Sequence, residues 1–397
     1  MLIKVLPTRM RLKELFFYLS FFLFWFSFFV NDIEQTHFAF DTLSKVLRYT
    51  SFIVALFGIA VGKSKMQSIK LLLIIFGFGL FTYIATKNTF FIGIGLLSYY
   101  ASNFKDQDII KTSFKYIVIS TLLVIMLQIA GIFENVKTAR WISSGAQLRN
   151  SYGFYHSNVL PIISLYAMSY FLLIKRKRIR YGDCFMMLII STVIYLLCDS
   201  RNALVSCFLM VFACLFSKML PVKKSVARII HSIAKWIVPA CCVFSICVPM
   251  ILSETPLLQV LDFMFTYRFT YGLQAIEQYG LHLVSIMDTE TYLQGATILD
   301  NGYMLVALRY GILYLLLLSI AVYRLAKKYK EDFFVNLVII IISVANIIDN
   351  DLFDYACLPF LLISLKATFT DFRVRLEGTK NGKTINFSNN EYIQRKC

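Results

Sequence analysis

The run Leu15-Phe-Phe-Tyr-Leu-Ser-Phe-Phe-Leu-Phe-Trp-Phe-Ser-Phe-Phe-Val30 contains no charged residue, and a second such run covers Leu71–Ala85. A helix of roughly 20 apolar residues crosses the roughly 30 Å hydrocarbon layer of a bilayer. Of the 397 residues, 58% are hydrophobic and only 16% are charged, whereas charged residues make up about 25% of an ordinary soluble domain. The sequence therefore predicts an all-α, polytopic integral membrane protein.

Apolar runs of this kind recur along the chain and predict about twelve transmembrane helices. We place them near residues 14–31, 46–62, 70–86, 88–101, 114–133, 158–174, 183–199, 202–217, 235–252, 303–322, 333–349 and 355–370. With these spans, 31 of the 40 Lys and Arg residues fall on one side of the membrane and nine fall on the other. Because Lys and Arg are enriched in cytoplasmic segments, both termini are predicted to be cytoplasmic. The net charge of +17 then reflects topology and does not call for a nucleic-acid partner.

The same charge rule resolves two long apolar stretches into hairpins. Asp183–Ser217 is too long for one crossing and has basic segments, Lys175–Arg178 and Lys218–Lys224, on both flanks. Both flanks belong on the cytoplasmic side, so this stretch is predicted to turn at an outer tip, Asp199-Ser200-Arg201. By the same reasoning, a second hairpin turns near residues 86–88.

The chain is predicted to form one transmembrane domain over residues 1–370, followed by a polar cytoplasmic tail at 371–397. Two outer loops are long, at 134–157 and 253–302, and the second is expected to form short amphipathic helices at the membrane surface. The nine cysteines show no CxxC spacing, so they are interpreted as packing residues and not as a metal site or disulfide framework.

Ionisable residues that could carry chemistry gather in the predicted outer loops and at the outer helix ends, and few lie at mid-membrane depth. They are Arg140, Arg149, His156, Asp199, Arg201, Arg268, Asp300, Asp349, Asp351 and Asp354. Charges at the bilayer centre would indicate a transport pathway, whereas this distribution favours a site at the outer surface. The alternative interpretation is that the arginines extend toward lipid head groups and that His156 caps a helix.

Arginine in several outer loops suits a lipid diphosphate substrate. The planar guanidinium binds phosphate oxygens through two parallel hydrogen bonds and stays charged. Several such groups would stabilise the negative charge that develops as a diphosphate leaves. A nearby His or Asp could accept the proton of an attacking sugar hydroxyl.

The order of short motifs resembles that of a known family. The first motif, just before a predicted span, is Gly153-Phe-Tyr-His156-Ser-Asn158, and the second, two spans later, is Ser200-Arg201. The third, in the large loop, is Arg268-Phe-Thr-Tyr-Gly272. The fourth, which leads into a span with Gly311, is Asp300-Asn301-Gly-Tyr303. This order is similar to that of the bacterial O-antigen and capsular polysaccharide polymerases (Wzy-type) and the related O-antigen ligases. The resemblance covers residues 131–360. It departs from the family at Ser157, where a proline is common.

The resemblance implies a GT-C-like glycosyltransferase at the outer face of the plasma membrane that polymerises repeat units carried on undecaprenyl diphosphate, without metal, cofactor or sugar nucleotide. It implies catalytic roles for Arg201, Arg268, His156 and Asp300, and substrate binding by Arg149, Asn158, Asn301 and Tyr303. Other implied partners are the lipid bilayer, a flippase and a chain-length regulator. The ligases often use a histidine in the large loop; His282 stands there between two leucines, a context that favours packing.

Two other functions remain open from sequence. An O-antigen ligase would transfer the finished chain to a different acceptor, and sequence does not identify the acceptor. A lipid-linked oligosaccharide flippase or other transporter would have its site near the midplane, often between inverted repeats. The absence of a visible repeat and the scarcity of mid-membrane charges favour the enzyme.

Overall fold

The computed structural model describes residues 8–33, 40–61, 66–142, 145–176, 178–219, 223–265, 267–285 and 300–380. The chain is mostly helical, and in these ranges six helices are long and apolar enough to cross a membrane by length and composition. They are α1 (Thr8–Phe29, apolar from Leu12), α2 (Asp41–Val61), α5 (Asp106–Ile129), α7 (Tyr181–Cys198), α8 (Arg201–Met219) and α9 (Lys224–Leu252). The prediction of an all-α membrane protein is thus confirmed at this level.

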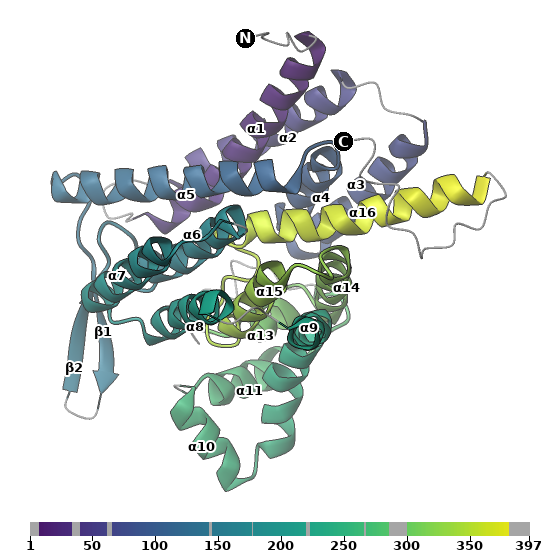
Figure 1. The fold of residues 1–397 in the computed structure, drawn as a ribbon. Coiled ribbons are helices and arrows are strands. Elements are labelled where there is room, and N and C mark those ends of the chain that lie inside the picture. The colour runs from purple at the N-terminus through teal and green to yellow at the C-terminus, as the bar shows by residue number, and fades with distance from the viewer. Residues whose placement is uncertain are drawn as a thin grey trace.

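Further apolar helices fall at or near the other predicted spans. They are α3 (Met66–Thr86), α4 (Phe90–Ala101), α6 (Val159–Lys175), α13 (Gly302–Arg309), α14 (Ile312–Lys328), α15 (Phe333–Ala345) and α16 (Leu358–Lys380). Helix α1 packs along α2, α3 along α4, α7 along α8, and α9 packs against both α14 and α15. Figure 1 shows α5 and α16 as long helices running across the picture, with α8, α9, α13, α14 and α15 below them.

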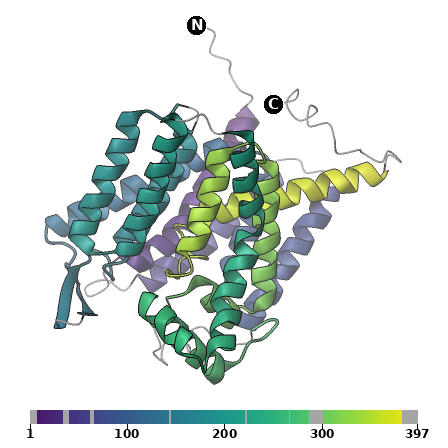
Figure 2. The same cartoon turned by 60° about the horizontal axis from the view of Figure 1, so that its bottom comes forward.

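The described part of the predicted large outer loop includes two short helices, α10 (Pro256–Met264) and α11 (Arg268–Tyr279). They form the lobe at the lower side of Figure 2, and α9 leads down to them. Helix α10 exposes apolar side chains, with Phe263 80% and Val260 57% exposed. This exposed apolar face has the character expected of a helix that lies at a membrane surface.

The structure shows two features that the sequence did not predict. The predicted loop 134–157 contains a β-hairpin, β1 (Lys137–Ile142) and β2 (Gly145–Asn150), which pair antiparallel with Thr138 opposite Arg149. The structure is therefore not purely helical. Helix α16 continues to Lys380, nine residues beyond the predicted start of the polar tail at 371, and residues 381–397 lie outside the described part of the chain.

The predicted span 303–322 is two helices and not one, because α13 and α14 are separated at Tyr310-Gly311. A short extended segment packs into this break and bonds to it. The amide of Ile312 donates to the His282 carbonyl, that of Leu313 to the Leu283 carbonyl, and that of Ser285 to the Tyr310 carbonyl, each at 3.0 Å. Gly311 has a φ of +105°, which only glycine adopts without strain, so the break is encoded at this residue.

Replacing Gly311 with alanine is expected to destabilise the protein by roughly 1–3 kcal/mol, the usual cost of a strained backbone conformation. An added Cβ would also lie 2.5 Å from the Leu283 carbonyl oxygen. Thermal unfolding in detergent should show a lower midpoint for Gly311→Ala than for Gly77→Ala, where an added Cβ meets nothing within 4 Å. Equal midpoints would show that the break tolerates a side chain.

Polar contacts at the two ends of the helices join different sets of segments. At one end, here called the basic end, Arg176 pairs with Asp332 at 2.9 Å, and the Lys218 ammonium donates to the Ile179 carbonyl at 2.7 Å. At the other, here called the acidic end, the Tyr155 amide donates to the Asp32 carbonyl at 3.0 Å. Each of these contacts joins segments that the charge rule assigns to the same side.

Candidate functional site

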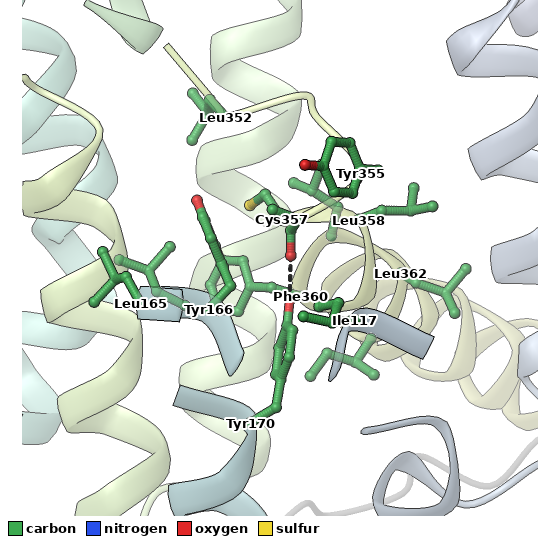
Figure 3. Close-up of a cluster of buried hydrophobic side chains, with 14 of the residues drawn as sticks. Ile117, Leu165, Tyr166, Tyr170, Leu352, Tyr355, Cys357, Leu358, Phe360 and Leu362 are labelled. Atoms are coloured by element: carbon green, nitrogen blue, oxygen red, sulfur yellow. Dashed lines mark hydrogen bonds between the residues drawn. The ribbon is translucent and has the colours of Figure 1, made fainter. Parts of the chain in front are cut away.

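The loop between α15 and α16, residues 346–357, is fixed at the acidic end by two tyrosines of α6. The Tyr170 hydroxyl donates to the Ala356 carbonyl at 2.7 Å, and the Asn346 side-chain NH2 donates to the Tyr166 hydroxyl at 3.1 Å. Figure 3 shows Tyr166 and Tyr170 beside Tyr355, Cys357 and the first turn of α16. Because these side chains are buried, the loop forms a rigid base for the residues around it.

Two other segments join this loop at Asp349. The Asn202 side chain, at the start of α8, donates to the Asp349 carboxylate and to the Ala345 carbonyl. The Gly302 amide, at the start of α13, donates to the Asp349 carbonyl at 2.8 Å. The α7–α8 tip and the α13 start, about 100 residues apart in the chain, thus meet at Asp349, the first at its carboxylate and the second at its backbone carbonyl.

The large loop adds an arginine to the same place. The Arg268 guanidinium, at the first residue of α11, lies 3.4 Å from the Asp300 carboxylate and 3.3 Å from the Phe265 carbonyl oxygen. Both side chains are largely shielded, with 14% of Arg268 and 33% of Asp300 exposed. The α11 start is held by Asp262, whose carboxylate accepts from the Phe269 amide at 3.0 Å.

The second arginine comes from the end of β2. The Arg149 guanidinium donates to the Asn158 side-chain oxygen at 3.0 Å, and the Asn158 amide donates to Nδ1 of His156 at 3.1 Å. This chain of contacts orients the imidazole. Because Nδ1 accepts a hydrogen bond, the neutral ring carries its proton on Nε2.

The loop that carries His156 is held at three points. The Tyr155 amide bonds to Asp32, and the Thr138 hydroxyl donates to the Ser157 hydroxyl at 2.6 Å. Gly153 has a φ of +87° and lies against Val124 and Gln128 of α5. Ser157 thus fastens the loop to β1 through a hydrogen bond.

Charge interactions connect these groups into one unit, here called the arginine–aspartate cluster, which comprises Arg149, His156, Arg268, Asp300 and Asp349. The pKa of Asp349 is raised to about 6, first by burial and also by the Asp300 charge. The Arg268 charge and the Asn202 hydrogen bond act in the opposite direction and lower it. Burial also lowers the pKa of His156, Arg149 lowers it further, and Asp300 raises it. Asp300 thus acts on both the histidine and the second carboxylate.

Further acidic groups follow Asp349 in the loop. Burial, with the neighbouring carboxylates Asp349 and Asp354, raises the pKa of Asp351 well above its ordinary value. Burial raises the pKa of Asp354 to about 7, while the Tyr355 amide bond and Arg309 lower it. Across the described ranges, no group of three or more His, Cys, Asp or Glu side chains is arranged to hold a metal ion.

The remaining predicted site residues are not members of the arginine–aspartate cluster. Arg201 is exposed at the first residue of α8, beside Asn202. Asn301 is buried and caps α13 by accepting from the Met304 amide at 3.1 Å. Tyr303 is fully buried and donates to the Ser343 carbonyl of α15 at 2.8 Å, so its hydroxyl serves helix packing.

His282, expected to pack, is exposed, and its Nε2 lies 3.1 Å from the Tyr279 carbonyl oxygen.

Sequence reasoning placed Asp349 at the outer end of a span but gave it no role, and it missed Asn202. The sequence does carry a signal for Asp349, because three carboxylates follow an apolar run within the six residues Asp349-Asn-Asp-Leu-Phe-Asp354. Helix α15 ends at Ala345, which places Asp349 in the loop and not in the span.

Comparison with protein-family models, with curated proteins and with solved structures finds no match to this chain.

Proposed function

We propose that this chain is a membrane glycosyltransferase that joins oligosaccharide repeat units carried on undecaprenyl diphosphate at the outer face of the plasma membrane. The observation that carries the proposal is the arginine–aspartate cluster. It brings two guanidiniums, an imidazole and two carboxylates together from β2, the loop before α6, α11, the α13 start and the α15–α16 loop. A diphosphate and an attacking hydroxyl need groups of these kinds in one place.

The proposed topology has about twelve crossings, a GT-C-like arrangement, and both termini in the cytoplasm. Polar contacts at the basic end join segments assigned to the cytoplasmic side, such as Arg176 with Asp332, and those at the acidic end join outer segments, such as Asn202 with Asp349. This segregation supports the proposal, because a wrongly assigned hairpin would bring a basic flank into the acidic end.

In the proposed reaction, the acceptor hydroxyl oxygen attacks the anomeric carbon of the donor chain. The new carbon–oxygen bond forms as the bond from that carbon to the diphosphate breaks, and the electron pair leaves with undecaprenyl diphosphate. Arg268 and Arg149 bind the diphosphate oxygens and stabilise this charge. Exposed Arg201, at the α7–α8 tip, binds the diphosphate as it arrives.

Asp349 is the proposed proton acceptor, in place of His156 or Asp300. Its raised pKa of about 6 brings its basicity nearer to neutral pH, where a general base is most effective. Asp300 is partly neutralised by Arg268 at 3.4 Å. Since Nδ1 of His156 already accepts from the Asn158 amide, the Nε2 proton of His156 is suited to donate to a sugar or phosphate oxygen.

The test is a reconstitution of the purified chain in liposomes. Lipid-linked oligosaccharides that accumulate in cells lacking this gene are extracted and added without nucleotide or metal. A product ladder spaced by one repeat unit is the expected result. Transfer to an acceptor other than the lipid-linked unit would indicate a ligase, and movement of the unit between leaflets without a ladder would indicate a flippase.

In the same assay, Arg201→Ala is expected to lower the initial rate roughly tenfold, mainly through KM, because an exposed arginine contributes to capture of the lipid diphosphate. Arg201→Lys should retain much of the activity, since it keeps the charge. Lys87→Asn, at another exposed turn of the acidic end, is the matched control. A fall in kcat at unchanged KM would contradict a capture role.

A further inference from the structure

A pocket lies at the basic end, where α5, α6, α15 and α16 approach one another. Its cavity volume is about 200 Å³, and it is partly open to the surroundings. The polar part of its lining includes Lys105, Gln107, Arg176 and Tyr329, and the apolar part is Ile110, Leu173, Val335 and Ile363. A pocket with a cationic polar rim and an aliphatic wall matches a molecule with an anionic head and a hydrocarbon tail.

The one carboxylate in the pocket lining is already neutralised. Asp106 lies 2.5 Å from the Lys328 ammonium and 2.5 Å from that of Lys366, and the Tyr329 hydroxyl donates to it at 2.7 Å. Asp106 and Lys366 are 5% and 6% exposed, so solvent screens this unit poorly. Two ammonium groups on one carboxylate leave a positive charge beside the pocket.

Arg176 adds to this charge at the pocket rim. Its Nη1 lies 2.9 Å from the Asp332 carboxylate, and its guanidinium stands 5.6 Å from the centre of the Tyr329 ring. A guanidinium has five N–H donors in a planar fork, so pairing through Nη1 leaves donors for a phosphate. With exposed Lys105, four cations surround the pocket against three carboxylates, Asp106, Asp108 and Asp332.

The pocket is far from the arginine–aspartate cluster. Asp106 begins α5, whereas Val124 and Gln128 near its other end support Gly153 in the loop that carries His156. The 24 residues of α5 span roughly 36 Å at 1.5 Å per residue. A ligand in this pocket therefore belongs to the leaflet opposite the proposed reaction.

We propose that this pocket binds an anionic phospholipid of the leaflet at the basic end, with its phosphate between Lys105 and Arg176 and its acyl chains along Ile110, Leu173 and Ile363. Basic pockets between transmembrane helices on the cytoplasmic side are suited to acidic head groups. The aliphatic wall favours a lipid over a free phosphate, because a soluble anion gains nothing from apolar contact.

Native mass spectrometry of the full chain tests the proposal. The purified protein in detergent is incubated with equimolar phosphatidylglycerol and phosphatidylcholine. One phosphatidylglycerol is expected to be retained at least fivefold more often than phosphatidylcholine, and the double variant Lys105→Gln/Arg176→Gln should lose this preference. Lys111→Gln, which removes an exposed charge from the same helix outside the pocket lining, should keep it.

A second variant separates the pocket from general charge. Gln107 is exposed and lines the pocket, so Gln107→Trp should fill the pocket, keep the net charge and also abolish retention. Retention of phosphatidylglycerol by both this variant and the double variant, each eluting as folded protein, would overturn the proposal. Displacement of the lipid by equimolar inorganic phosphate or glycerophosphoglycerol would overturn the lipid assignment in favour of a soluble anion.

Discussion

Arg268→Ala is expected to lower the rate of polymer formation by about 10²–10³-fold, the usual effect of removing one preorganised donor from a developing anion. Arg268 lies against Asp300 and carries the charge that acts on Asp349. Its removal takes away a diphosphate ligand and also leaves these carboxylates with less opposing charge. Initial rates from the ladder assay measure the effect, with loss expected in kcat because the interaction strengthens as the diphosphate leaves.

Two comparisons keep this result interpretable. Arg268→Lys keeps a charge but not the planar fork, so it should recover only part of the rate. Lys45→Ala removes an exposed cation of α2, outside the cluster, and should leave the rate within twofold. Wild-type activity in Arg268→Ala at equal abundance would exclude this arginine from the mechanism.

Asp349→Asn is expected to abolish measurable polymerisation, at a cost of 10²–10⁴-fold for loss of a general base. The wild-type rate should rise about tenfold per pH unit below pH 6 and level off above it, because burial raises the pKa of Asp349 to about 6. A residual rate in the variant that no longer follows this profile would assign the titration to Asp349. An unchanged profile would assign it to another group.

Stability provides an independent measurement on the same variant. Because the folded-state pKa of Asp349 is raised, its protonated form stabilises the fold; that stability is present below its ordinary pKa of about 3.8 and is lost as pH rises through about 6. Asparagine stays neutral at every pH. At pH 8, therefore, Asp349→Asn should unfold at a temperature equal to or above that of the wild type, which would separate lost catalysis from lost folding.

Composition predicted the helical membrane fold because each transmembrane helix must be locally apolar; the sidedness inferred from Lys and Arg stays a prediction. The same rules did not show the division of 303–322 at Gly311. The hydropathy of an apolar run is the same whether its helix is continuous or broken. The break at Gly311 depends on contacts with segment 282–285, which comes from another part of the chain. The β-hairpin at 137–150 was missed because hydropathy does not distinguish short strands from a loop.

The candidate site was predicted in part for a related reason. Arg149, His156 and Asn158 lie within ten residues, so their contacts follow from local sequence. The convergence of Arg268, Asp300 and Asp349 needs the tertiary fold. For Tyr303, the motif resemblance suggests substrate binding, whereas the fold places its hydroxyl against the backbone of α15.

The two ammonium groups that pair with Asp106 are synthesised long after the carboxylate itself. Its partners Lys328 and Lys366 come 222 and 260 residues later in the chain. At a translation rate of about 5–20 residues per second, Lys366 is made roughly 13–50 s after Asp106. Until Lys328 is made, α5 begins with a carboxylate that has neither ammonium partner. A nascent chain that stops before α16 contains Lys328 but not Lys366, so its Asp106 carboxylate is balanced in charge by one ammonium and lacks the second hydrogen-bond donor.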